Sequence, residues 1–229
     1  MAANIAELKR IRELAEKHHA KVVAVSKTKP PEDILGLYEA GHRIFGENYV
    51  QELLEKQRSL PLDIRWHFIG HLQSNKVKYI ASFIRMIHSV DNARLLKEIS
   101  KQAQKTGRVI DCLLQIHIAK EETKFGLDET ELIHLLEEVM LHPANYQHIR
   151  LCGLMGMATN TPDENVVREE FHYLKALFDK MAEKYISHPE HFTEISMGMS
   201  SDYRLAVEQG STLLRIGSLL FGERSYGPA

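Results

Sequence analysis

Eight short runs of apolar, mostly β-branched residues recur along this chain, and each is followed by a helical or turn-like stretch. Such alternation is typical of parallel α/β folds, in which helices cover the sheet between successive strands. A charged, amphipathic helix pattern, IAELKRIRELAEKHH, precedes the first run. We expect strands at residues 21–26, 42–46, 64–70, 85–90, 109–118, 149–157, 192–198 and 212–218.

Eight strands with short connections predict a closed (β/α)8 barrel preceded by an N-terminal helix. The alternative is an open doubly wound sheet, but neither G-x-G-x-x-G nor G-x-x-x-x-G-K-[ST] follows any of the strands. Helix signals agree with this spacing: Pro31 stands in the first turn of a helix that is expected to end at Gly41, and residues 128–131 and 161–164 are typical of capping boxes. No linker divides the chain, so residues 1–229 are expected to form a single domain.

Composition restricts the class of protein further. The 229 residues are 44% hydrophobic, and 29 Lys and Arg balance 31 Asp and Glu, so nucleic acid is not the expected partner. The first helix pattern has no apolar core of a signal peptide and no run spans a membrane, which favours a cytoplasmic protein without a membrane partner. Cys112 and Cys152 fall inside apolar runs and are expected to be buried thiols.

A lysine stands where the first strand should end, in VVAVSKTKP. Barrel active sites lie at the carboxyl ends of the strands, and alternation along strands 1 and 8 puts Lys27 and Arg215 at the same mouth. A nearby cation and partial burial lower the pKa of a lysine, and a neutral amine can attack a carbonyl to form a Schiff base. The simpler interpretation is a solvated lysine at a strand end, and Lys120 and Lys124 are rival candidates.

The segment EISMGMSSDYRLAVEQGSTLLRIGSLLFGER supplies small and hydroxylated residues after strands 7 and 8, where barrels often bind phosphate. The stretch SSDY is expected to open a helix. Ser200, Ser201 and Ser218 could instead cap turns. Together, a lysine, an arginine and a phosphate cradle describe a site for a phosphorylated aldehyde, and pyridoxal 5′-phosphate is the cofactor that fits.

Other polar residues carry weaker signals. His67 and His71 suggest a metal, but no third ligand follows at a useful spacing, so no metal site is expected. Asn48, with Gln51 three residues later, is explained by an ordinary helix N-cap. A Schiff-base aldolase without a cofactor would leave Arg215 and the phosphate cradle unexplained.

Seven segments closely resemble the pyridoxal phosphate homeostasis proteins of the YggS family, also called proline synthetase co-transcribed homologues. They run in order and cover nearly the whole chain: AVSKTKP, FGENYVQE, WHFIGHLQSNK, KFG, LMGMA, SMGMSSD and GSTLLRIGSLLFGER. The resemblance implies an alanine-racemase-like barrel of pyridoxal phosphate fold type III.

The resemblance also implies roles for single residues. Lys27 would hold the cofactor as a Schiff base, and Asn48 would lie beside it. Arg215 would face the pyridine nitrogen. The phosphate would be held by Ser200, Gly217 and Ser218, the last of which is often threonine in relatives.

The function implied is intracellular homeostasis of pyridoxal phosphate, by buffering and delivery to apo-enzymes, with an effect on amino acid balance and no established reaction. The alternative is a small amino acid racemase that uses Lys27. An arginine at the pyridine nitrogen weakens the ring as an electron sink. The chain also ends soon after strand 8, without the extra domain that helps alanine racemase to supply a second base, so a monomeric carrier is the expectation.

Overall fold

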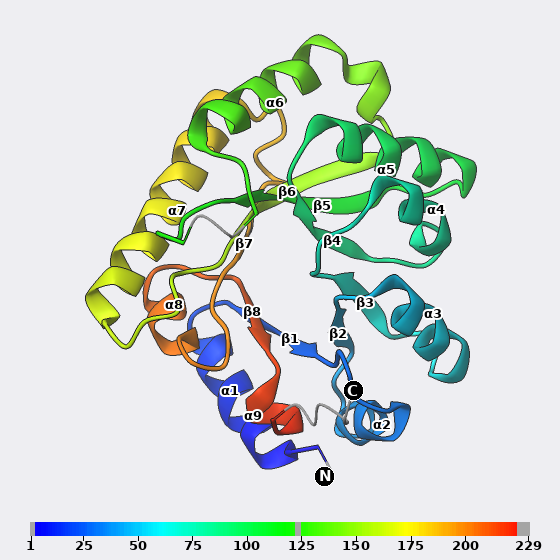
Figure 1. Ribbon diagram of the computed structural model, residues 1–229, viewed down its shortest axis with the longest axis vertical. Helices are drawn as coiled ribbons and strands as arrows, with labels where there is room; N and C mark the ends of the chain where they lie inside the picture. Colours follow the sequence, from blue (N-terminus) through cyan, green and yellow to red (C-terminus); the bar gives the residue numbers. More distant parts are fainter. Residues whose placement is uncertain (1–2, 122–124, 224–229) are drawn as a thin grey trace.

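The computed structural model describes residues 3–121 and 125–223, and Lys124 therefore lies outside the described residues. Within these ranges eight parallel strands close into a barrel in chain order, β1 beside β8, as the sequence predicts. Figure 1 shows them as a ring around the middle of the molecule, with the helices outside. The strands are β1 (Lys21–Val25), β2 (Ile44–Glu47), β3 (Arg65–Phe68), β4 (Met86–Val90), β5 (Ile110–Ile116), β6 (Ile149–Gly156), β7 (Glu194–Ser196) and β8 (Leu213–Ile216).

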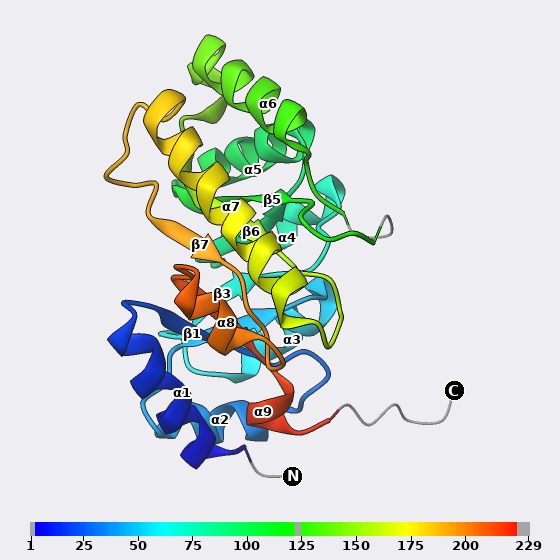
Figure 2. The same ribbon diagram turned by 90° about the vertical axis from the view of Figure 1, so that its left-hand side faces the viewer.

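The helices follow the strands and cover the outside of the barrel, which Figure 2 shows from the side. The expected first helix, α1, precedes β1, and the backbone N–H of Asn4 donates to Leu220 O in the last helix, 2.8 Å away. The helices are α1 (Ile5–Lys17), α2 (Pro31–Glu39), α3 (Val50–Ser59), η1 (Ser74–Lys76), α4 (Val77–Ile80), α5 (Ala93–Lys105), α6 (Glu129–Leu141), η2 (Pro143–Tyr146), α7 (Glu164–Lys184), α8 (Tyr203–Glu208) and α9 (Ser218–Phe221).

Two expected helix starts differ in outcome. The capping box at residues 128–131 is confirmed, because Asp128 and Glu131 exchange side-chain and backbone hydrogen bonds at the start of α6. The box at 161–164 is wrong. The N-cap of α7 is Asp163, whose carboxylate accepts from the Asn165 N–H, whereas the hydroxyl of Thr161 accepts from the Asp163 N–H. The Asp163 carboxylate, two residues after Thr161, therefore caps the helix in place of the expected Thr161 hydroxyl.

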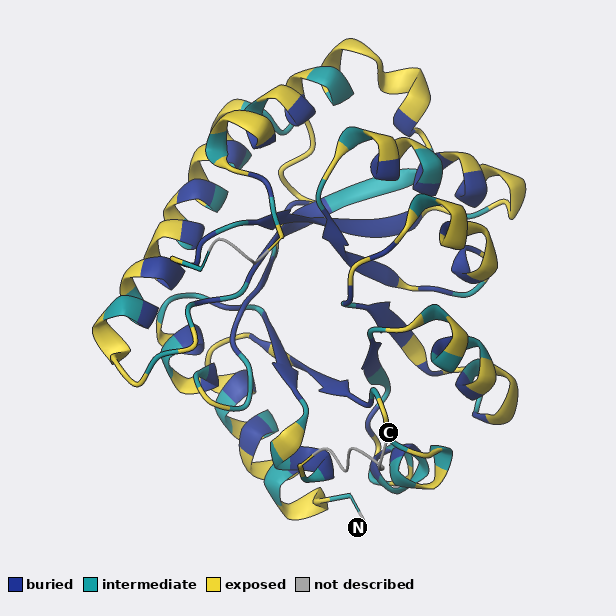
Figure 3. Cartoon of the chain, in the orientation of Figure 1, coloured by how far each residue is buried: buried dark blue, intermediate teal, exposed yellow. Residues whose placement is uncertain are grey.

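Apolar side chains fill two regions. The larger cluster lies between the strands and the helices, and Figure 3 shows buried strands inside helices whose outer faces are exposed. A smaller cluster lies separately and consists of strand residues: Val23, Met86, Leu113, Cys152, Met155 and Leu213. Polar residues of the strands are buried as well. Cys112 and Cys152 are buried free thiols, as expected, and burial raises the pKa of Cys152 to about 12.

No helix among residues 3–121 and 125–223 combines the length and the apolar character needed to cross a bilayer.

Candidate functional site

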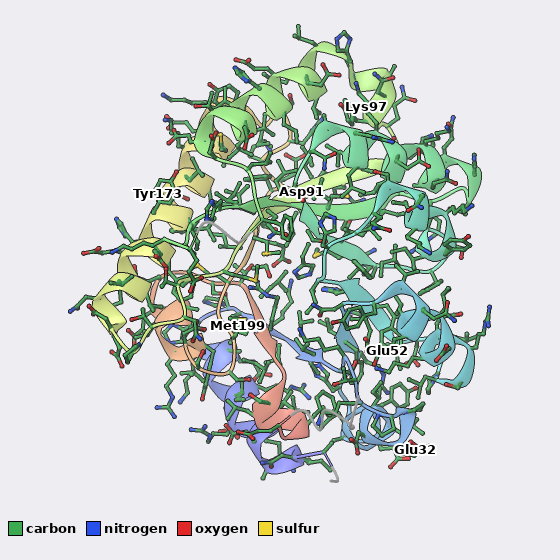
Figure 4. All side chains as sticks on the ribbon, viewed as in Figure 1. Glu32, Glu52, Asp91, Lys97, Tyr173 and Met199 are labelled. Carbon is green, nitrogen blue, oxygen red and sulfur yellow. The ribbon has the colours of Figure 1, made fainter. Side chains whose placement is uncertain are left out.

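A pocket of about 300 Å³ lies at the carboxyl ends of the strands. It is lined by residues that follow β1, β2, β3, β6, β7 and β8, together with Val25 at the end of β1 and Arg215 inside β8. Figure 4 labels one of them, Met199, in the loop between β7 and α8. All six candidate residues from the sequence line this pocket: Lys27, Asn48, Ser200, Arg215, Gly217 and Ser218. Ser201, Lys29, Val25, Ile69, Met157 and Gly222 complete its lining.

Lys27 stands on a tight turn just past β1. The Ser26 N–H donates to Gly46 O at 3.0 Å, so β1 and β2 are still paired when the turn begins. Thr28 then adopts φ +64°, a left-handed conformation that costs free energy in a residue with a Cβ. The carboxylate of Glu52 accepts from the Thr28 N–H at 2.5 Å and holds this conformation. This contact fixes the backbone next to the half-buried Lys27.

A buried network of ion pairs and hydrogen bonds stabilises the same turn. The ammonium of Lys56 donates to Ser26 O at 2.7 Å, to Glu47 Oε1 at 2.7 Å and to Glu52 Oε1 at 2.6 Å, and the Ser26 hydroxyl donates to Glu47 Oε1 at 2.6 Å. Figure 4 labels Glu52 on α3. Burial raises the pKa of Glu47, and the Lys56 ammonium opposes that shift. Ion pairs this deep favour one geometry over others, because any displacement leaves a charge uncompensated.

Sequence reasoning missed Lys56 and Glu52. Their spacing of four residues on a helix was visible, but such pairs usually lie on the solvated face. Their contact with the turn after β1 depends on how α3 packs against β2. A local sequence pattern does not predict this packing.

Arg215 is held rigidly inside the barrel. It stands opposite Val23 of β1, so Lys27 and Arg215 share the mouth that strand alternation predicted. Its guanidinium donates to Ser196 O and to Ser196 Oγ, both at 2.7 Å, and to Gly156 O at 2.9 Å. Burial lowers its pKa to about 10, so the side chain is still a cation at neutral pH. It can donate hydrogen bonds but cannot accept them.

The hydroxyl side of the pocket is built by the loops after β7 and β8. Ser200 Oγ accepts from the Gly217 N–H at 3.2 Å and joins the two loops. A Cβ on Gly217 would lie 3.5 Å from Val25, within ordinary contact. The helix expected at SSDY is α8, and the carboxylate of Asp202 accepts from the Met199 N–H in the turn before it. Ser200 thus bonds to another loop and does not cap its own turn.

The expectation that Asn48 is an ordinary N-cap is wrong. The helix after it, α3, begins at Val50, its N-cap is Tyr49, and no side chain caps it. The Oδ1 atom of Asn48 is buried in the pocket wall without a hydrogen-bond partner among the described residues. A Cβ on Gly70 would lie 2.4 Å from Asn48 O, so the WHFIGH segment needs glycine to let β2 and β3 approach. A buried acceptor of this kind fits a ligand that brings a donor.

The rival lysine does not reach the pocket. Lys120 is exposed, does not line the cavity, and its backbone N–H donates to Thr159 Oγ1 at 3.0 Å. His71 stacks on Phe125 and lies 3.6 Å from a carboxylate oxygen of Asp91, the residue labelled in Figure 4. In the part of the chain that the structure describes, no group of three or more His, Cys, Asp or Glu could hold a metal ion.

Comparison with known proteins gives the family. A family model described as "Alanine racemase, N-terminal domain" matches residues 1–225. A pyridoxal phosphate homeostasis protein of Aquifex aeolicus is 42% identical over 208 residues, which is 90% of this chain and 88% of the relative. The human protein of that name is 38% identical over 216 residues, 90% of this chain and 77% of the relative. The chain thus belongs to the alanine racemase N-terminal domain family and, within it, to the pyridoxal phosphate homeostasis proteins.

Solved structures agree with this assignment. PipY of Synechococcus elongatus, solved without pyridoxal phosphate, has a TM-score of 0.86 and 33% identity over 95% of this chain and 99% of its own. The same protein with pyridoxal phosphate bound has a TM-score of 0.81 over 96% of this chain and all of its own. Alanine racemase from Bartonella henselae has a TM-score of 0.67 at 16% identity over 95% of this chain and 59% of its own, which shows a shared barrel fold.

Proposed function

We propose that this protein holds pyridoxal 5′-phosphate in the pocket at the carboxyl ends of the strands, as a Schiff base on Lys27, and serves pyridoxal phosphate homeostasis. One observation carries the proposal: six residues from separate parts of the chain, each expected at a cofactor from the sequence, line a single pocket. The relatives named for this function and PipY with pyridoxal phosphate bound support it.

Each lining residue matches one part of the cofactor. Lys27 supplies the amine for the aldehyde, and Arg215 supplies fixed donors for the pyridine nitrogen. Ser200, Gly217 and Ser218 supply hydroxyl and N–H groups for the phosphate, once the Ser200–Gly217 bond opens. Asn48 brings a buried oxygen that needs a donor.

The charges around the pocket favour a carrier of pyridoxal phosphate over an enzyme that uses it. When bound, pyridoxal phosphate supplies an electrophilic aldehyde and a ring that accepts electrons best when its nitrogen is protonated. Arg215 donates to that nitrogen without giving up its proton, because the guanidinium remains a cation even at its lowered pKa of about 10. The ring is therefore a weak electron sink here, and a cofactor held this way is stored more readily than used.

The racemase alternative needs a second group that exchanges a proton on the other face of the substrate. Among the described lining residues, Lys27, Lys29 and Arg215 are ionisable. The Lys29 ammonium donates to Glu223 O at 3.0 Å, and Arg215 keeps its proton. We expect no exchange of solvent deuterium into the α position of amino acids when the loaded protein is incubated with them. Exchange that Lys27→Ala abolishes would instead support the racemase.

Attachment to Lys27 is tested by adding pyridoxal phosphate, recording the visible spectrum, treating with borohydride and mapping the labelled peptide. The wild type should turn yellow, lose that band on reduction, and carry one pyridoxyl group on Lys27. Lys29→Ala, a matched change in the same pocket, should keep the label on Lys27, whereas Lys27→Ala should remain unlabelled. Label on Lys120, or a wild type that stays colourless, would contradict the proposal.

We further propose that residues 1–229 form a single domain that works as a cytoplasmic monomer and delivers the cofactor to apo-enzymes. The continuous larger core, which packs α1 and α9 against the barrel, supports one domain. Light scattering checks the monomer, and activation of a purified apo-aminotransferase by the loaded protein checks delivery. A stable dimer, or activation no faster than by the free cofactor, would contradict these points.

A further inference from the structure

A second cavity, of about 270 Å³, lies at the opposite end of the barrel, where the strands begin. Its lining comes from all eight strands or the residues just before them, and includes Lys21, Arg65, His67, Arg85, Asp111 and Arg150. None of the six residues proposed to hold the cofactor is among its described lining residues. The proposed function therefore does not explain this cavity.

The charges around the cavity do not cancel. Four cationic side chains line it against three carboxylates. Lys21 pairs with Glu194 at 2.6 Å, while Arg85 and Arg150 share Asp111 at 3.0 and 3.3 Å. The third carboxylate, Glu190, pairs with His188 at 3.1 Å, and no described carboxylate pairs with Arg65. A small anion would balance the excess positive charge.

A buried chain of hydrogen bonds fixes the proton positions at the cavity floor. It runs from Arg215 through Ser196 Oγ (2.7 Å) to His88 Nδ1 (2.9 Å), and from His88 Nε2 to His67 Nδ1 (2.9 Å). Arg215 only donates, so Ser196 Oγ accepts from it. The Ser196 hydroxyl is fully buried, and His88 Nδ1 is the only described acceptor bonded to it. Leaving that hydroxyl hydrogen unbonded would be costly, so the serine donates to His88.

The remaining tautomers follow from this first step. His88 accepts at Nδ1 and therefore carries its proton on Nε2, from which it donates to His67 Nδ1. His67 then carries its own proton on Nε2. Both rings are neutral, because burial lowers the pKa of His67 to about 3 and that of His88 well below its usual value. His67 is 4% exposed, lines the cavity, and donates from Nε2 to no described residue. Its N–H group is therefore left for whatever occupies the cavity.

We infer that the cavity at the amino ends of the strands is a binding site for a small oxyanion, such as phosphate or a carboxylate. The Nε2–H of His67 donates to the anion from the floor, and the Arg65 guanidinium pairs with it at the rim. A cation, or a neutral ligand with few acceptors, could not accept the hydrogen bonds that these two groups donate. It would also leave the charge of Arg65 without a partner.

The test is an NMR titration of the histidine ring nitrogens with inorganic phosphate, and a parallel titration with acetate separates phosphate from carboxylate preference. Before any addition, His67 should show the Nε2–H tautomer. Added anion should then shift His67 Nε2 in a saturable way, equally with and without pyridoxal phosphate. Arg65→Gln should weaken binding about tenfold, as expected for one lost charge-assisted hydrogen bond. Arg58→Gln, an equal change of charge at an exposed position on α3, should leave the affinity unchanged.

Three results would overturn the inference. The first is a His67 ring protonated at Nδ1 in the free protein. The second is a shift of His67 that fails to saturate with either anion, or that disappears once pyridoxal phosphate is bound, which would put the anion in the other pocket. The third is equal weakening by Arg65→Gln and Arg58→Gln, which would indicate general screening in place of a site.

Discussion

Lys56 joins the turn that carries Lys27 to the rest of the molecule. Its side chain is 4% exposed, and its ammonium donates to a backbone carbonyl and two carboxylates at once. Glu47 Oε2 is buried without a partner among the described residues, so the carboxylate depends on Lys56 for compensation. Removing the lysine alone would leave a buried negative charge beside the turn.

We therefore expect Lys56→Met to lower the free energy of unfolding by about 3–5 kcal/mol, the usual loss when one partner of a buried ion pair is removed. Urea unfolding measures this change. The double variant Lys56→Met/Glu47→Gln should regain part of the loss, because it removes the uncompensated charge. Lys175→Met, which breaks an exposed pair with Asp179 at the same helical spacing, is the control and should change little. Equal losses in Lys56→Met and Lys175→Met would show that the network does not matter.

The same network should affect function at Lys27. If the network positions Lys27, pyridoxal phosphate should attach to Lys27 more slowly in Lys56→Met than in the wild type. The rate is measured as growth of the yellow band under conditions where the variant is fully folded.

At the level of elements, periodicity was enough to predict every strand and the order of the barrel. Buried parallel strands are almost uniformly apolar, and amphipathic helices repeat every 3.6 residues, so both leave strong local signals. Alternation along β1 and β8 also predicted the shared mouth of Lys27 and Arg215, because the side-chain period of a strand is fixed.

Contacts between elements were not predictable in this way. The box at 161–164 failed because Asp163 caps the helix. Asn48 failed as an N-cap because α3 begins at Val50 with Tyr49 as its N-cap, which leaves Asn48 in the connection that lines the pocket. His67 was considered only as a metal ligand, yet it bonds to His88 on the neighbouring strand β4. Which inward residues meet depends on the stagger of neighbouring strands, and one-dimensional spacing does not contain that stagger.

Across the whole molecule, polar groups cross an otherwise apolar barrel from one end to the other. His67, His88 and Ser196 connect the cavity at the amino ends to Arg215 in the pocket at the carboxyl ends. Burying neutral histidines makes the fold sensitive to acid, because protonation in place would require a charge without a partner.

Stability should accordingly fall as pH drops. Burial lowers the pKa of His42 to about 4 and of His67 to about 3, and that of His88 well below its usual value. Between these values and about 6.5, the pKa of an unfolded histidine, the unfolded chain binds more protons than the folded one, so stability rises with pH across this window. Each residue can contribute a slope of up to about 1.4 kcal/mol per pH unit.

Urea unfolding at several pH values from 7 to 4.5 measures this slope. His42→Gln keeps a side-chain donor for Ile44 O, which His42 Nε2 contacts at 2.8 Å, but removes a titrating group. It should reduce the slope by about a third, the share of one histidine among three equal contributors. His134→Gln, at an exposed position on α6, is the matched control and should leave the slope unchanged. If His42→Gln left the slope as steep as in the wild type, the loss of stability in acid would have to come from carboxylates, whose pairing with Lys and Arg fails at lower pH.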